Sequence, residues 1–113
     1  DENIIKASIS VAPYVLIPSS QERIDFNYSF PSQSRVIVRV FDLSGRFITT
    51  LVDHYFDNSG TVYRQEDTSD WDGRDHLGQI LSPGTYMIHI EAMNFQTGVT
   101  TRDMAPIVIG IKP

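Results

Sequence analysis

Cysteine is absent from the 113 residues of the sequence. Its absence excludes structural disulfides, thiolate metal ligands and cysteine nucleophiles. Long apolar runs are also absent, since none approaches the roughly 20 residues that a membrane-spanning helix needs. Basic residues are outnumbered, because 9 Lys and Arg stand against 14 Asp and Glu and give a net charge of −5. An acidic chain repels nucleic acid, so we expect neither nucleic-acid binding nor membrane insertion.

Helical periodicity is missing as well, because no stretch carries apolar residues at i, i+3, i+4 and i+7 over several turns. The length suits one domain with one core. The sequence begins at Asp1 without a methionine or a basic, apolar leader. We therefore expect residues 1–113 to form a single domain that is a fragment of a larger protein.

Apolar and polar residues alternate along most of the chain, which is the pattern of half-buried β-strands. Pro106 is expected to interrupt or bulge the last strand, since proline cannot donate to a ladder. The polar stretch 53–70 has no clear pattern, and we expect a mobile loop there. About seven short strands predict an all-β fold, an immunoglobulin-like antiparallel β-sandwich. The expected strands lie in residues 4–12, 23–31, 35–43, 46–52, 85–92, 98–104 and 106–111.

Clusters of aspartate and glycine punctuate these strands. We interpret the clusters as turns, because glycine adopts positive φ readily and aspartate accepts hydrogen bonds from nearby backbone N–H groups. Trp71 is expected to bury its ring over the core, and Tyr86 to tie a strand to a loop, as in a tyrosine corner. The residues of these motifs are Asp42-x-x-Gly45-Arg46, then Trp71-Asp72-Gly73-x-Asp75-x-x-Gly78, and Gly84-x-Tyr86.

These motifs resemble those of the immunoglobulin-like, fibronectin III-like domain of the flagellar hook-capping FlgD family, over roughly residues 5–111. The sequence departs from the family at residues 12–23 and in the segment 60–71, so no binding role is transferred to those loops. The resemblance implies a module that recurs at the C-terminus of many secreted bacterial proteins, including cargo of the type IX secretion system. It therefore implies a secreted or cell-surface location in a bacterium.

A calcium site is the alternative interpretation of the aspartate cluster. Asp70, Asp72 and Asp75 could supply oxygen ligands to a loop that binds calcium. An EF-hand is excluded, because its first and twelfth positions would be Thr68 and Gln79 in place of carboxylates. The sequence favours a turn, with no cofactor and no metal, and leaves the calcium loop as the rival.

Catalytic patterns are not found. His54, His76 and His89 have no metal-ligand spacing, and there is no Gly-x-Ser-x-Gly elbow or phosphate-binding glycine loop. His89 is expected on the outward face of its strand as an ordinary solvated histidine. We therefore predict that the chain is not an enzyme and has no catalytic residues.

Four aromatic residues lie in or beside expected loops, where they could form a platform for a carbohydrate or a surface for a protein partner. The alternative, which we favour, is that they cap the ends of the sandwich. They are Tyr55, Phe56, Tyr63 and Phe95.

The predicted function is a non-catalytic accessory module of a larger exported bacterial protein. It would act as a spacer, as a docking or stabilising domain, or as part of a secretion or surface-attachment signal. Its expected partners are the neighbouring domains of the parent chain and the export or attachment machinery. The alternatives are a carbohydrate- or calcium-binding module and a structural assembly domain like the hook cap.

Overall fold

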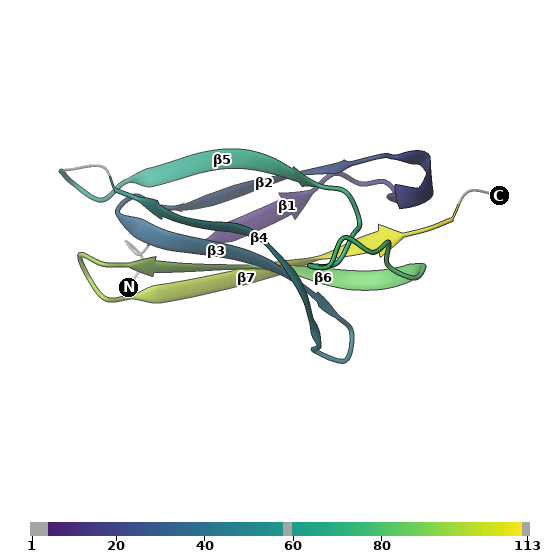
Figure 1. The fold of residues 1–113 in the computed structure, drawn as a ribbon. Helices are drawn as coiled ribbons and strands as arrows, with labels where there is room; N and C mark the ends of the chain where they lie inside the picture. The colour runs from purple at the N-terminus through teal and green to yellow at the C-terminus, as the bar shows by residue number, and fades with distance from the viewer. Residues whose placement is uncertain (1–4, 58–59, 112–113) are drawn as a thin grey trace.

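The computed structural model describes residues 5–57 and 60–111, which form two antiparallel β-sheets packed face to face (Figure 1). One sheet has three strands in the order β1-β2-β5, and the other has four in the order β4-β3-β6-β7. The predicted immunoglobulin-like β-sandwich of seven strands is thereby confirmed. The strands are β1 (Ser8–Val11), β2 (Ile24–Pro31), β3 (Ser34–Asp42), β4 (Phe47–Phe56), β5 (Arg64–Trp71), β6 (Gly84–Asn94) and β7 (Thr100–Ile109), with a 3-10 turn at Pro18–Ser20.

The core lies between the inner faces of the two sheets. Alternation places Phe26 and Phe30 of β2 on the inner face of the smaller sheet, and both are fully buried. Val38 of β3 pairs with Ile90 of β6 on the inner face of the larger sheet, and neither is exposed. Burying a side chain of this size stabilises the fold by roughly 1.5–3 kcal/mol. The period of two in the sequence therefore corresponds directly to the two sides of each sheet.

The polar stretch 53–70 is mostly strand, and the prediction of a loop there is wrong. β4 continues to Phe56, and β5 begins at Arg64. β5 forms an unbroken register with β2, from Pro31 opposite Arg64 to Ile24 opposite Trp71. It carries no recognisable alternation because three polar residues occupy its inner face. These residues are Gln65, Asp67 and Ser69, which lie opposite Phe30, Tyr28 and Phe26.

Pro106 does not interrupt the last strand, contrary to the prediction. β7 runs continuously through it, with Pro106 opposite Met87 of β6. β7 is an edge strand, and the carbonyl of Val108 faces outward, where it accepts from the N–H of Leu16 (2.9 Å). Pro106 lies two residues earlier and so has the same orientation. Its missing N–H would have faced away from β6, and no bond of the sheet is lost.

The two sheets are joined along one side by hydrogen bonds from β1 and the residue before it to side chains of β7. The N–H of Ala7 donates to Thr101 Oγ1 (2.8 Å). The N–H of Ile9 donates to Asp103 Oδ2 (3.0 Å). These side-chain acceptors satisfy outward-facing donors of the short edge strand β1, which would otherwise lack partners in the fold.

Candidate functional site

The first aspartate motif forms a tight turn between β3 and β4. Asp42 Oδ1 accepts from the backbone N–H groups of Ser44 (3.0 Å) and Arg46 (2.9 Å), and from the Ser44 hydroxyl (2.7 Å). The Gly45 N–H donates to the Asp42 carbonyl (3.0 Å), and Gly45 has φ of +90°. The carboxylate thus replaces the backbone partners that a turn lacks. The expected hairpin turn is present here.

The second aspartate motif contains a turn of the same geometry. Asp75 Oδ1 accepts from the N–H groups of Leu77 (2.9 Å) and Gln79 (2.9 Å). The Gly78 N–H donates to the Asp75 carbonyl (3.0 Å), and Gly78 has φ of +84°. We call these two segments, Asp42–Arg46 and Asp75–Gln79, the aspartate-glycine turns. Their shared spacing, aspartate followed three residues later by glycine, is the signal that the sequence offered for both.

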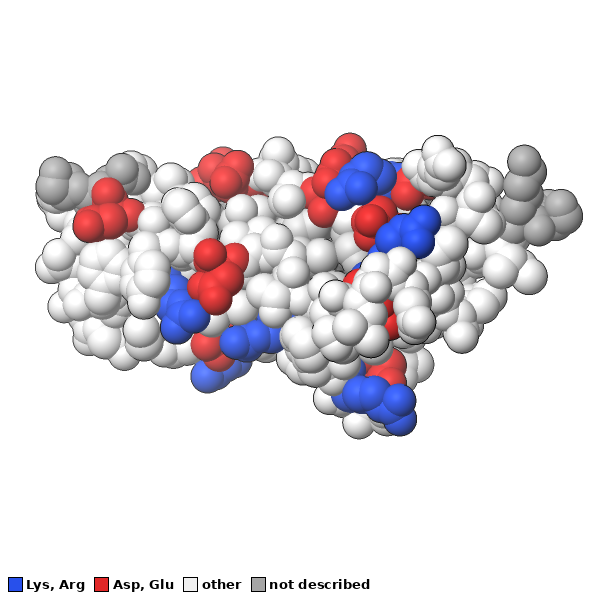
Figure 2. Space-filling model, viewed as in Figure 1, with Lys and Arg blue, Asp and Glu red and all other residues white. Residues whose placement is uncertain are grey.

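Two further aspartates of the candidate calcium loop lie in ion pairs. Asp70 Oδ1 is 2.9 Å from the Arg23 guanidinium, and Asp72 Oδ2 is 3.8 Å from both Arg23 and Arg74. Asp72 Oδ1 also accepts from the Arg74 N–H (3.2 Å). Figure 2 shows several acidic side chains beside basic ones on this side of the molecule. Among residues 5–57 and 60–111, no group of three or more His, Asp or Glu side chains is arranged to hold a metal ion.

Trp71 and Gly73 anchor the segment that follows β5. Trp71 ends the strand with its ring in the core, and its indole N–H donates to the Arg74 carbonyl (3.0 Å). Gly73 is buried with φ of +78°, and a Cβ built on it would lie 2.4 Å from Pro18 Cγ and 3.2 Å from Leu16 Cδ2. This glycine therefore permits a close approach between two segments in addition to shaping a turn.

Tyr86 forms the bond expected of a tyrosine corner. Its hydroxyl donates to the Ser82 carbonyl (2.7 Å), which ties the start of β6 to the loop before it. The acceptor is a backbone oxygen, so no acidic partner side chain is needed. Burial raises the pKa of Tyr86, which keeps the phenol protonated as a donor.

The four aromatic candidates do not share one environment. Phe56 packs against the core, with its ring 4.4 Å from that of Phe30, and so acts as a cap. Tyr55 and Phe95 are exposed and lie beside each other, with ring centroids 6.4 Å apart. Tyr63 is exposed, and its N–H donates to Ser32 Oγ (3.0 Å). The capping hypothesis thus describes Phe56, whereas Tyr55, Tyr63 and Phe95 are exposed.

The histidines lie apart in the fold and have different surroundings. His76 Nδ1 is 3.0 Å from the Ile48 carbonyl, so this ring nitrogen acts as a donor to the backbone. His89 lies on the outer side of β6, as predicted, but it is half-buried, and its Nδ1 has no hydrogen-bond partner among the described residues. Burial lowers the pKa of His89. The expectation of an ordinary solvated histidine does not describe this residue.

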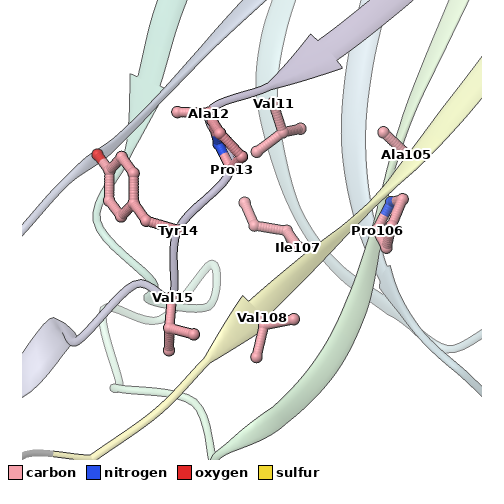
Figure 3. A pocket seen from close by; sticks show the side chains of 9 residues that line it. All are labelled: Val11, Ala12, Pro13, Tyr14, Val15, Ala105, Pro106, Ile107 and Val108. Atoms are coloured by element: carbon pink, nitrogen blue, oxygen red, sulfur yellow. The ribbon is translucent and has the colours of Figure 1, made fainter.

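An apolar groove opens in the seam between β1 and β7, beyond the bond made by Asp103. Pro13 and Pro106 lie on its two sides, and neither has an N–H with which to bridge it. Figure 3 shows the Ile107 side chain reaching from β7 toward Val11 and Pro13. The seam closes again at Leu16, which pairs with Ile109. The two prolines thus explain the groove, because neither can donate the backbone hydrogen bond that would join the edges of the two sheets there.

The aspartate-glycine turns predict how stability depends on pH. The Ser44 hydroxyl and the Arg46 N–H hold the pKa of Asp42 below its ordinary value, and the Gln79 and Leu77 N–H groups do the same for the pKa of Asp75. A depressed folded pKa stabilises the fold above the unfolded value of about 3.9, and this contribution is lost as pH falls through the folded pKa. The lowered pKa of His89 acts at higher pH, because its protonation favours the unfolded chain below about pH 6.5. We therefore expect Tm to fall gently from neutral pH to about pH 5 and steeply below about pH 4, where the two carboxylates lose their charge.

Thermal unfolding of the double variant Asp42→Asn, Asp75→Asn measures this effect. Asparagine keeps the Oδ1 acceptor but has no charge, so the acid-induced loss of Tm should become shallower. The matched control is Asp25→Asn, since Asp25 is exposed on β2 and its side chain makes no hydrogen bond among the described residues. If the Tm of the double variant falls at acid pH as steeply as that of the wild type, the role given to these carboxylates is contradicted.

The fold and the turns define this chain as an immunoglobulin-like β-sandwich domain. Its conspicuous aspartates accept hydrogen bonds from backbone N–H groups or form ion pairs with arginine. Within residues 5–57 and 60–111, no helix has the length and apolar character to span a bilayer. No protein-family model matches the chain, and no curated protein matches it either.

Two solved structures from Porphyromonas gingivalis contain a part with this fold. One is the dimeric latent form of PorU, with a TM-score of 0.59 and 19% identity over 97% of this chain and 10% of that one. The other is PorZ, an essential bacterial surface component of the type IX secretion system, with a TM-score of 0.52 and 13% identity. That match covers 90% of this chain and 11% of PorZ. The chain thus spans a small part of each protein, and the similarity is one of fold. Membership of the hook-capping FlgD family stays a prediction.

Proposed function

We propose that this chain is a non-catalytic accessory domain of a larger exported bacterial protein. It stabilises and positions its neighbouring domains and contributes to export or surface attachment. Its location is secreted or at the cell surface, and the motif pattern supports our placing it among the FlgD-type, fibronectin III-like modules.

The observation that carries this proposal is the coverage of the structural match. The similarity takes in 97% of this chain but 10% of PorU, so a sandwich of this size occurs there as one module of a much larger protein. PorZ, of which a similarly small part is matched, is a surface component of a secretion system. Domains of one chain stabilise each other by covering apolar surface, which is the role we assign here.

The surroundings of the polar side chains support a non-catalytic role. Asp42 and Asp75 accept backbone N–H groups, and Asp70 and Asp72 lie in ion pairs. An active site holds such groups ready for a substrate, whereas here they complete turns and cross-strand contacts. We therefore infer that the domain is not an enzyme and has no cofactor.

Deleting residues 1–113 from the full-length parent protein tests the proposal. We expect the specific activity of the remaining domains to be retained, while yield, Tm or the fraction outside the cell falls. A third form, in which an unrelated β-sandwich of equal length replaces these residues, separates a spacer from a docking domain, because a spacer is restored by any such sandwich. Loss of turnover on the natural substrate with normal folding and export would overturn the proposal.

A further inference from the structure

The outer face of the four-stranded sheet is organised in cross-strand rows. The register places directly opposite residues on the same face, so the four strands together form rows of four side chains. We name two of them, the apolar row and the Arg39 row, which lie next to each other. The apolar row is Phe47, Phe41, Met87 and Pro106, and the Arg39 row is Thr50, Arg39, His89 and Met104.

The apolar row and its neighbours expose large hydrophobic side chains. Phe47 is 44% exposed, Met104 is 56% exposed and Val108, which follows Pro106 on the same face, is 40% exposed. The rings of Phe41 and Phe47 contact edge to face, with centroids 6.2 Å apart. The solvated face of an antiparallel sheet is ordinarily polar. A contiguous apolar patch on it marks an interaction surface.

The outer face of the three-stranded sheet shows the contrast within the same molecule. Its residues opposite one another are all small or polar, and none is a large hydrophobic residue. The apolar row is therefore a property of one face and not of the chain as a whole. The outer residues of this sheet are Pro31 and Arg64, then Ser8, Ser29 and Glu66, then Ser10, Asn27 and Thr68, then Asp25 and Asp70.

Two polar groups of the Arg39 row lack a direct partner in the described part of the chain. Arg39 is half-buried and makes no ion pair within 4 Å there, although its charge, beside the hydrogen bond from Arg35, helps to lower the pKa of Asp53. The Nδ1 atom of His89, directly opposite Arg39, is buried without a hydrogen bond, and its ring contacts Phe41 at 5.9 Å. Buried polar groups normally have partners, and the Nδ1 of His89 shows that this row is left incomplete within the fold. Arg39 is partly exposed and would gain a direct partner from a molecule seated on this face.

The other cations of this face are already neutralised. Arg35 makes two bonds of 3.0 Å to Asp53. Arg102 Nε is 3.1 Å from Glu91 Oε1. Among the described residues, Arg39 is thus the positive charge of this face that makes no direct ion pair, and it lies between the ion pairs and the apolar row on a protein whose net charge is −5. An acidic partner would be repelled by most of the domain and attracted here, which fixes where and how it docks.

We propose that the apolar row and the Arg39 row form a docking surface for an acidic protein partner, one that places a carboxylate on Arg39 among apolar side chains. The proposal rests on the proposed function, since it names the surface through which the domain meets a neighbour. A second copy of the chain is the weaker occupant. Its own apolar row and Arg39 row contain no carboxylate to meet Arg39, and the outer face of its smaller sheet has no large apolar residue to cover the apolar row.

A peptide titration followed by amide NMR on this chain tests the proposal. The probe is a synthetic peptide with the repeat Leu-Ser-Glu-Ser-Phe-Ser, which presents Leu, Glu and Phe on one side of an extended strand. We expect it to shift the amide signals of Arg39, Phe41, His89 and Met104. Matched peptides with Gln or Lys in place of Glu should bind about tenfold more weakly or not at all, since a charge-assisted bond is lost.

Two variants of the chain complete the experiment. Arg39→Glu should weaken binding of the acidic peptide at least about tenfold, and Met104→Ser should weaken it through the apolar half of the surface. The control is Arg46→Glu, which makes the same charge change at a hairpin residue whose side chain is 81% exposed. Unchanged Tm in all three shows that the fold is intact.

Four results would overturn the proposal. They are no shift with any peptide, equal binding of the Glu and Gln peptides, shifts confined to another surface, and equal losses in Arg39→Glu and Arg46→Glu. Sedimentation velocity adds a further test, because a wild-type dimer that Arg39→Glu dissociates would make a second copy the occupant. The deletion experiment on the parent protein measures export and yield and so tests the proposed function. The peptide titration tests the docking surface, and the two outcomes can be told apart.

Discussion

Replacing Trp71 by alanine is expected to lower the free energy of unfolding by about 3–5 kcal/mol, the range measured when large aromatic residues in protein cores are truncated. The indole is 2% exposed and lies at the end of β5, where it packs in the core. Truncation also removes the hydrogen bond to the Arg74 carbonyl and so loosens the segment that follows. Urea denaturation monitored by far-UV circular dichroism measures the change, since the variant has no tryptophan left to report.

Trp71→Phe is the matched variant, because it keeps an aromatic ring in the core but loses the indole N–H. It should be destabilised clearly less than Trp71→Ala. Trp71 is the sole tryptophan of the sequence, so the native fluorescence reports on this site alone. Its emission should be blue-shifted and poorly quenched. A red-shifted emission that acrylamide quenches readily would place the ring in water and contradict this assignment.

Replacing Gly73 by alanine is expected to cost about 2–5 kcal/mol, the sum of a left-handed backbone penalty and a core clash. The backbone has φ of +78°, and the added methyl group would lie 2.4 Å from Pro18 Cγ. Pro18 belongs to the 3-10 turn before β2 and is itself buried, so it has little room to move. Thermal and urea unfolding of the variant measure the loss.

Gly78→Ala provides the control within the same loop. Gly78 also has a positive φ, +84°, but a Cβ added there would meet nothing within 4 Å. Its substitution should cost only the backbone penalty, roughly 1–2 kcal/mol. The difference between the two variants isolates the contact with Pro18. Equal losses would show that the clash relaxes freely and that Gly73 serves the turn alone.

The strands that face both core and solvent could be predicted from the sequence. β2 and β6 alternate cleanly because one side of each contributes to the core and the other does not. The aspartate-glycine turns were also predictable, since their geometry depends on residues four positions apart. In both cases the physical cause is local.

Features that depend on a partner strand could not be predicted. β5 was missed because its inner face is polar and its existence depends on pairing with β2. Pro106 was misjudged because its effect depends on whether β7 is an edge strand, which only the strand order reveals. The apolar row likewise takes one residue from each of four strands. Each strand contributes a single apolar residue, which is unremarkable in its own sequence.

Pro106 also bears on how the domain behaves at high concentration. An edge strand with a regular series of free N–H and C=O groups can recruit a strand from another copy, and repeated recruitment leads to fibrils. β7 is an edge of its sheet. β1 bonds to it through the side chains of Thr101 and Asp103, and Leu16 pairs with its backbone at Val108, so the edge is left uncovered at the groove beside Pro106. The proline removes one donor from the middle of the series, so an incoming strand meets a gap in its ladder. The domain can therefore present an apolar face to a partner, while the edge of the same sheet resists pairing with a strand from another copy.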